Sequence, residues 1–147
     1  MSPTYKRDRP ARIVLVDDDR TTSRLIEIAL RRTGVPLDLQ IVHDGDDAIA
    51  ALETISPPWN DIPDLLLLDL HMPGKNGFEV LEYVKQHEHL RRIPVVMFSN
   101  SEVAADVNRA YDLHVNAYVR KSVEFAELCI TIDTILHFWL RTATTPF

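Results

Sequence analysis

Each of four short apolar runs in this sequence leads to a residue type that could do chemistry. The residues that end or follow these runs are Asp17, Asp18, Asp19, Asp69, Ser99 and Lys121. Asp69 stands out because it follows four leucines at 65–68, a segment suited to full burial. A buried carboxylate without a partner is costly. Its position therefore suggests a site at the mouth of a sheet.

Such a set of side chains suits phosphoryl transfer. Carboxylates held together repel one another, and a divalent cation with a preference for oxygen ligands, such as Mg²⁺, would remove that repulsion. Asp69 could then stay ionised and act as a nucleophile. Lys121 could pair with a phosphoryl oxygen as a point charge, and Ser99 could donate a hydrogen bond to another.

Each of these residues also has a purely structural interpretation. The run from Asp17 to Asp19 could be a solvated turn, with Asp19 as a helix N-cap. Asp69 could simply end a strand and begin a turn. Ser99 and Lys121, taken singly, are of types that are more often structural or solvated. Their shared position at strand ends favours a joint site.

The elements that would position these residues alternate regularly. Apolar runs predict strands at 12–16, 37–42, 65–69, 94–99 and 117–120. Amphipathic stretches predict helices at 21–34, 45–55, 78–90, 102–114 and 122–140. This alternation predicts an α/β fold, a five-stranded parallel sheet with helices on both faces. Ligands bind beyond the carboxyl ends of such strands, where the polar residues lie.

Composition limits the classes of protein. A chain of 147 residues, 46% of them hydrophobic, suits one domain, with short tails expected at 1–10 and 142–147. The net charge of −6 disfavours wholesale binding to nucleic acid or an anionic membrane. The single cysteine, Cys129, excludes an internal disulfide and fits a reducing compartment. No secretory signal or membrane-spanning run is visible, so we expect a cytoplasmic protein.

Five sequence pieces, in order, resemble a receiver domain of two-component response regulators. They are "IVLVDD", "HDGDDAIAAL", "LLLLDLHMPGKNGFEVL", "IPVVMFSNS" and "AYVRKS". The resemblance covers residues 11–141 and implies the (βα)5 flavodoxin-like receiver fold. It also implies a signalling module, not an enzyme with a separate substrate, that accepts a phosphoryl group from a histidine kinase.

The resemblance implies particular roles in the acceptor site. Asp69 would be the phospho-accepting aspartate. Asp17 and Asp18 would hold Mg²⁺ or Mn²⁺ together with Asp69 and the backbone carbonyl of His71. Lys121 would be the lysine of the family pattern.

Other roles concern switching and lifetime. Ser99 would be the switch hydroxyl, and Tyr118 the aromatic residue that turns inward with it. Ser122 departs from the family pattern, which usually has proline after the lysine. His71 and Ser101 occupy positions that tune dephosphorylation in the family, so the phosphoryl lifetime does not follow from the sequence.

A narrower similarity concerns the partner. The pieces "RRIPVVMFSNSE", "YDLHVNAYVRKS" and "HFWLRTATTPF" are similar to stand-alone receivers that partner bacterial phytochrome histidine kinases. This similarity implies a light-sensing kinase as partner and no attached DNA-binding domain.

Two other functions fit parts of the sequence. Asp17-x-Asp19-x-Thr21 after a strand matches the first motif of Mg-dependent phosphatases of the haloacid dehalogenase type, in which Asp17 would be the nucleophile. The chain is short for such an enzyme with its cap domain and lacks the late acidic pair. A degenerate interaction domain without phosphorylation is the third alternative, which the intact set of site residues disfavours.

The C-terminal helix carries more apolar residues than one core-facing stripe needs. The expected stripe consists of Phe125, Leu128, Ile132, Ile135 and Trp139. The residues left over are Val123, Ile130, Leu136, Phe138 and Leu140. This excess predicts a homodimer through the C-terminal helix. The alternative is that the helix end and the tail fold back over these residues.

Overall fold

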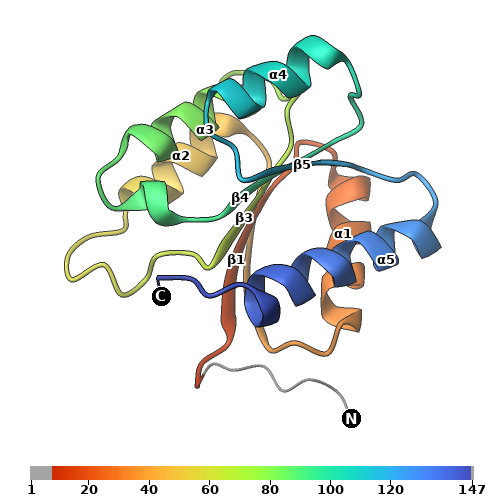
Figure 1. Cartoon of the computed structure of the whole chain (residues 1–147), viewed down its shortest axis with the longest axis horizontal. Coiled ribbons are helices and arrows are strands. Elements are labelled where there is room, and N and C mark those ends of the chain that lie inside the picture. The colour runs from red at the N-terminus through yellow and green to blue at the C-terminus, as the bar shows by residue number, and fades with distance from the viewer. Residues whose placement is uncertain (1–7, 147) are drawn as a thin grey trace.

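The computed structural model describes residues 8–146 and contains a five-stranded sheet (Figure 1). The strands are β1 (Ala11–Val16), β2 (Leu37–Val42), β3 (Leu65–Leu68), β4 (Val95–Ser99) and β5 (Ala117–Arg120). Their order is β2-β1-β3-β4-β5, and every pairing is parallel. All five carboxyl ends therefore lie at one edge of the sheet. The predicted flavodoxin-like fold is confirmed.

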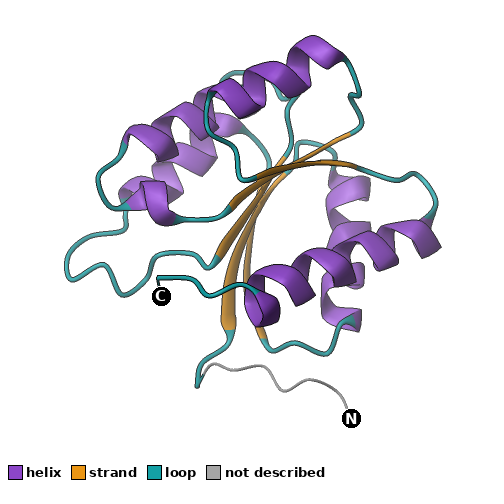
Figure 2. Ribbon diagram, viewed as in Figure 1, coloured by secondary structure: helices purple, strands orange, loops and turns teal. Residues whose placement is uncertain are grey.

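Helices cover both faces of the sheet (Figure 2). They are α1 (Arg20–Arg32), α2 (Gly45–Glu53), α3 (Gly77–Gln86), α4 (Ala104–Asp112) and α5 (Phe125–His137). The 3₁₀ turn η1 (Leu90–Arg92) follows α3, and the π-helical turn η2 (Phe138–Thr142) extends α5. In Figures 1 and 2, α1 and α5 lie on one face and α2, α3 and α4 on the other.

The central strand β3 explains the run of four leucines. Successive side chains of a strand point to opposite faces. Leu66 and Leu68 pack in the apolar layer beneath α2, α3 and α4, whereas Leu65 and Leu67 pack in the layer beneath α1 and α5. All four are completely buried. A strand with helices on both faces needs apolar residues at every position, and it leaves Asp69 at a rigid end.

The last two helices begin later than the sequence predicted. Helix α4 begins at Ala104, because the hydroxyl of Ser101 accepts a hydrogen bond from the Val103 N–H (3.3 Å). Helix α5 begins at Phe125, because the Ser122 hydroxyl accepts one from the Glu124 N–H (3.3 Å). Serine side chains that bond to nearby backbone favour turns over helix.

The prediction for α5 was wrong for two of the five left-over residues. Leu136 and Leu140 are only 1% and 4% exposed. They continue a four-residue spacing from Ile132, so the buried stripe is broader than expected. Phe138, by contrast, is 48% exposed, and Val123 and Ile130 are exposed still more.

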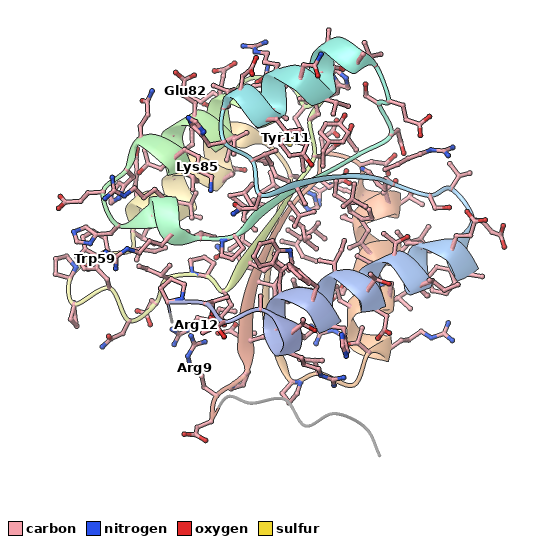
Figure 3. All side chains as sticks on the ribbon, viewed as in Figure 1. Arg9, Arg12, Trp59, Glu82, Lys85 and Tyr111 are labelled. Atoms are coloured by element: carbon pink, nitrogen blue, oxygen red, sulfur yellow. The ribbon has the colours of Figure 1, made fainter. Side chains whose placement is uncertain are left out.

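Residues near both ends of the described chain, Arg9 and Pro146, line one pocket with Trp59 of the loop between α2 and β3 (Arg9 and Trp59 are labelled in Figure 3). Arg9 donates to both carboxylate oxygens of the buried Asp64 (2.9 and 3.0 Å). Arg12 pairs with Asp61 (3.3 Å), and Pro146 lines the same pocket as these arginines. Most of the N-terminal tail expected at 1–10, residues 1–7, lies outside the described residues. Within 8–146, no helix is long and apolar enough to cross a membrane.

Candidate functional site

A pocket of about 220 Å³ lies at the carboxyl edge of the sheet. Its lining residues are Asp17, Asp18, Asp19, Thr22, Asp69, His71, Ser99, Asn100 and Lys121. All but Thr22, which lies in the first turn of α1, come from the ends of β1, β3, β4 and β5, which are far apart in sequence and adjacent in the sheet. The structure therefore brings together the site residues that the sequence predicted, except Tyr118, which does not line the pocket.

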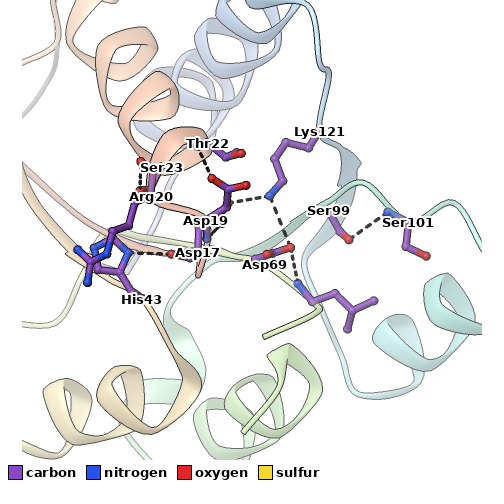
Figure 4. A network of polar contacts seen from close by, with 11 residues as sticks. Asp17, Asp19, Arg20, Thr22, Ser23, His43, Asp69, Ser99, Ser101 and Lys121 are labelled. Atoms are coloured by element: carbon purple, nitrogen blue, oxygen red, sulfur yellow. Dashed lines mark hydrogen bonds and ion pairs between the residues drawn. The ribbon is translucent and has the colours of Figure 1, made fainter. Parts of the chain in front are cut away.

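Asp17 is buried and fully engaged (Figure 4). One carboxylate oxygen lies 2.7 Å from the Lys121 ammonium, and the other accepts a hydrogen bond from the Asp19 N–H (2.9 Å). Asp19 in turn caps α1, since its carboxylate accepts from the Thr22 N–H (3.0 Å). That hydrogen bond holds the pKa of Asp19 below its ordinary value. Asp19 is thus the N-cap that the structural interpretation expected.

Asp69 has one engaged and one open carboxylate oxygen. Its Oδ1 accepts the Leu70 N–H (2.9 Å) and lies 3.6 Å from the Lys121 ammonium. Its Oδ2 accepts no hydrogen bond from any residue that the structure describes. Burial raises the pKa of Asp69 to about 6, against the opposing effect of Lys121, and the neighbouring Asp17 raises it further. When deprotonated, Asp69 is therefore a carboxylate with one open oxygen, held in place by the end of β3.

The three carboxylates of Asp17, Asp18 and Asp69 form one cluster. Each offers an oxygen, and these oxygens lie within 4.8 Å of one another. Asp17 is buried, whereas Asp18 is exposed at the pocket mouth. One lysine faces this cluster of three acids, so negative charge remains uncompensated. Oxygen-only donors with excess negative charge fit a hard divalent cation.

The region around Ser99 forms a chain of contacts that ends at Tyr118. Ser99 is buried, and its hydroxyl oxygen accepts a hydrogen bond from the Ser101 N–H (3.2 Å). The Tyr118 hydroxyl donates to the Ser101 carbonyl (2.7 Å). The Ser101 hydroxyl donates to Asp106 (2.7 Å), whose carboxylate lies 3.6 Å from His71 Nε2. The loop after β4 thus connects the pocket to α4 and β5.

The departure at Ser122 does not displace the lysine. The Lys121–Ser122 peptide bond is trans, and Lys121 still reaches both Asp17 and Asp69. The Ser122 hydroxyl donates to Glu127 (2.8 Å) in the first turn of α5. Serine here anchors the loop to the helix that follows.

Sequence reasoning missed three residues at the site. Thr22 and Asn100 line the pocket. His43, at the end of β2, has its Nδ1 3.0 Å from the backbone carbonyl oxygen of Asp17. Only the order of strands in the sheet, with β2 beside β1, could have indicated this contact, because residues 17 and 43 share no local motif.

A family model of the response regulator receiver domain matches residues 13–133. The chain belongs to the response regulator receiver family. Response regulator Rcp1 of Synechocystis sp. is 41% identical over 138 residues, which are 93% of this chain and 94% of that protein.

Solved structures agree with this assignment. The crystal structure of the phosphorylated cyanobacterial phytochrome response regulator RcpA matches with a TM-score of 0.86 and 42% identity, covering 94% of this chain and 99% of that one. The Mn²⁺-bound form of response regulator Rcp1 matches with a TM-score of 0.83 and 39% identity, covering 94% of this chain and 100% of that one.

The haloacid-dehalogenase-type phosphatase is not supported. The family match identifies a receiver. In addition, both carboxylate oxygens of Asp17, the nucleophile that the phosphatase would need, are already engaged by Lys121 and the Asp19 N–H.

Proposed function

We propose that this receiver accepts a phosphoryl group on Asp69 from a phosphohistidine of a histidine kinase. The observation that carries the proposal is that Oδ2 of Asp69 is open in the pocket. The Lys121 ammonium lies 3.6 Å from the other oxygen, Oδ1. Asp69 attacks phosphorus, the P–N bond to the donor imidazole breaks, and its electron pair returns to the imidazole. Lys121 then pairs with a phosphoryl oxygen, and Ser99 donates to another.

Asp17, Asp18 and Asp69 would hold Mg²⁺ or Mn²⁺, with the backbone carbonyl of His71 as a further ligand. The cluster of oxygens within 4.8 Å supports this, as does the Mn²⁺-bound form of the relative Rcp1. When bound, the cation would neutralise charge on the phosphoryl oxygens. The protein's part is to hold the acids together and to keep Lys121 between Asp17 and Asp69.

Phosphorylation would be read out through Ser99 and Tyr118. A hydroxyl drawn toward a phosphoryl oxygen would give up its hydrogen bond from the Ser101 N–H. Because the Tyr118 hydroxyl is hydrogen-bonded to the Ser101 carbonyl, the loop after β4 and the strand β5 would move together. The chain would act only on its own phosphorylation and dephosphorylation, without another substrate.

The kinase partner would be a bacterial phytochrome. Support comes from the similarity to RcpA, a cyanobacterial phytochrome response regulator, at 42% identity. Phosphotransfer from such a kinase and the lone Cys129 fit a cytoplasmic location, and the receiver unit would span residues 11–141.

A homodimer through α5 is the remaining part of the proposal. Val123, Ile130 and Phe138 are 93%, 68% and 48% exposed. Exposed apolar side chains on α5 and on the residues that flank it favour a second copy as the partner. The groove between α1 and α5, about 300 Å³ and lined partly by Ile130, lies beside them.

The test is phosphorylation by acetyl phosphate, followed by intact-mass spectrometry. Wild type should gain one phosphoryl group in Mg²⁺ and none in EDTA, and Asp18→Ala in Mg²⁺ should resemble wild type in EDTA. Undiminished transfer in EDTA would contradict the metal role. A phytochrome-type kinase autophosphorylated with labelled ATP should also transfer label to wild type; transfer from unrelated kinases alone would contradict the partner.

A further inference from the structure

His43 makes a contact that the proposed function leaves unexplained. It follows β2, is half-buried, and lies with Nδ1 3.0 Å from the Asp17 carbonyl oxygen (Figure 4). A carbonyl oxygen only accepts hydrogen bonds, so Nδ1 must carry the proton and donate. The neutral ring has its proton on Nδ1 in this arrangement, and the charged ring carries one there too.

This contact fixes one particular peptide plane. The Asp17 N–H donates to the Val42 carbonyl (3.1 Å), so the peptide before Asp17 is held in the sheet. The Asp17 carboxylate is held by Lys121 and the Asp19 N–H. The Asp17 carbonyl belongs to the next peptide, which carries Asp18, and His43 is its side-chain partner.

The position of Asp18 depends on its backbone, because its side chain has few contacts of its own. It is exposed and makes no ion pair or side-chain hydrogen bond with the described residues. Its carboxylate nevertheless lies within 4.8 Å of those of Asp17 and Asp69. The direction in which the chain leaves Asp17 therefore determines where the Asp18 carboxylate lies.

We propose that His43 is a positioning residue for the acidic cluster: by donating to the Asp17 carbonyl it holds the Asp17–Asp18 peptide so that Asp18 reaches the metal position. This inference rests on the proposed function. Removing a group that orients a metal ligand through a hydrogen bond typically lowers metal affinity about 10- to 100-fold.

The test compares Mn²⁺ binding by matched variants, with free Mn²⁺ measured by electron paramagnetic resonance. His43→Leu removes the donor, and His43→Asn restores an N–H near the Nδ1 position. His87→Leu is the control, because His87 is also half-buried and its Nδ1 accepts the His89 and Leu90 N–H groups (both 3.1 Å). None of these three residues lines the pocket.

His43→Leu should raise the Kd for Mn²⁺ about tenfold, and His43→Asn should recover most of the loss. His87→Leu should leave the Kd unchanged while lowering the free energy of unfolding. If His43→Leu only lowered stability and bound Mn²⁺ like wild type, the positioning role would be refuted. Should the leucine variant lose its far-ultraviolet circular dichroism, His43→Ala provides the same comparison. A wild type that bound no Mn²⁺ would instead overturn the metal site.

Discussion

At the scale of single residues, Asp69 combines burial with a reactive charge. The same burial that holds its carboxylate in place raises the pKa of Asp69 to about 6. The one ammonium beside it, that of Lys121, is also paired with Asp17. The metal-free site is therefore electrostatically unfavourable at neutral pH. That cost is a direct consequence of placing a carboxylate at the end of an apolar strand.

Asp69→Asn should stabilise the metal-free protein. A carboxyl group with a pKa near 6 when folded and about 4 when unfolded stabilises the fold only when protonated. Its contribution is fully present below about pH 4 and is lost as the pH rises through about 6. At pH 7.5 in EDTA, the variant should gain about 1 to 3 kcal/mol in urea unfolding, after discounting for solvent screening.

The gain in stability should disappear near pH 4, where the Asp69 side chain of the folded wild type is protonated and therefore uncharged, like the asparagine of the variant. It should also shrink in Mg²⁺, which wild type binds more tightly than the variant. Equal stabilities at pH 7.5 in EDTA would show that Asp69 is not strained by its surroundings.

The residue types at this site were predictable, whereas some of their contacts were not. The sequence placed Asp17, Asp69 and Lys121 at strand ends, and a parallel sheet necessarily brings such ends to one edge. Which carboxylate Lys121 contacts more closely depends on side-chain geometry. The contact between His43 and Asp17, which are 26 residues apart in sequence, could be predicted only if β2 were known to lie beside β1.

At the scale of elements, α5 shows both the strength and the limit of periodicity. The spacing of apolar residues correctly predicted a long helix packed against the sheet. It did not separate Leu136, which is buried, from Phe138, which is exposed. Leu136 continues the four-residue spacing from Ile132 to Leu140, whereas Phe138 lies two residues after Leu136 and therefore points to nearly the opposite side of the helix.

Two isoleucines of α5 form a matched test of this packing. Ile132 is completely buried, whereas Ile130 is 68% exposed. Ile132→Ala should lower the free energy of unfolding by about 2 to 5 kcal/mol, because it leaves a cavity in the core. Ile130→Ala should change it by less than about 0.5 kcal/mol. Urea denaturation of dilute protein measures both, and equal losses would contradict the placement of the helix.

The loop after β4 should respond as a unit when the acceptor is occupied. Beryllofluoride mimics the phosphoryl group, so Ser99 should move toward it and release the Ser101 N–H. Through the Tyr118 hydroxyl, the change should reach β5. Amide NMR should show shifts at 99–103 and 117–120, since one ligand can shift two states that differ by a few kcal/mol.

Asp69→Asn is the control for this experiment, because it should show none of these shifts. Unchanged spectra for the wild-type loop and β5 with saturating beryllofluoride would contradict the coupling between Ser99 and Tyr118.

At the scale of the whole molecule, the active edge and the exposed side of α5 are separate surfaces. The pocket lies at the carboxyl ends of the strands, whereas Ile130 and Phe138 lie along the helix on one face. A receiver built this way can be phosphorylated at one surface while a second copy occupies the other. The negative net charge of −6 opposes association, so apolar burial would have to outweigh it.

Wild type should be a dimer by light scattering at micromolar concentration. The double variant Ile130→Glu, Phe138→Glu should be a monomer with unchanged circular dichroism, because it places charges on the exposed side of α5 only. Val103→Glu, at an apolar residue that is 59% exposed just before α4, is a control of the same kind away from this helix. A wild type that remained monomeric with and without beryllofluoride would refute the dimer.

The central claim is that Asp69, and no other carboxylate of the pocket, forms the acyl phosphate. Borohydride reduces an aspartyl phosphate to homoserine, which peptide mass spectrometry locates in the sequence. After phosphorylation in Mg²⁺ and reduction, wild type should contain homoserine at position 69 alone, and Asp69→Asn should contain none. Homoserine at position 17 or 18, or phosphorylation without any homoserine at 69, would contradict the account.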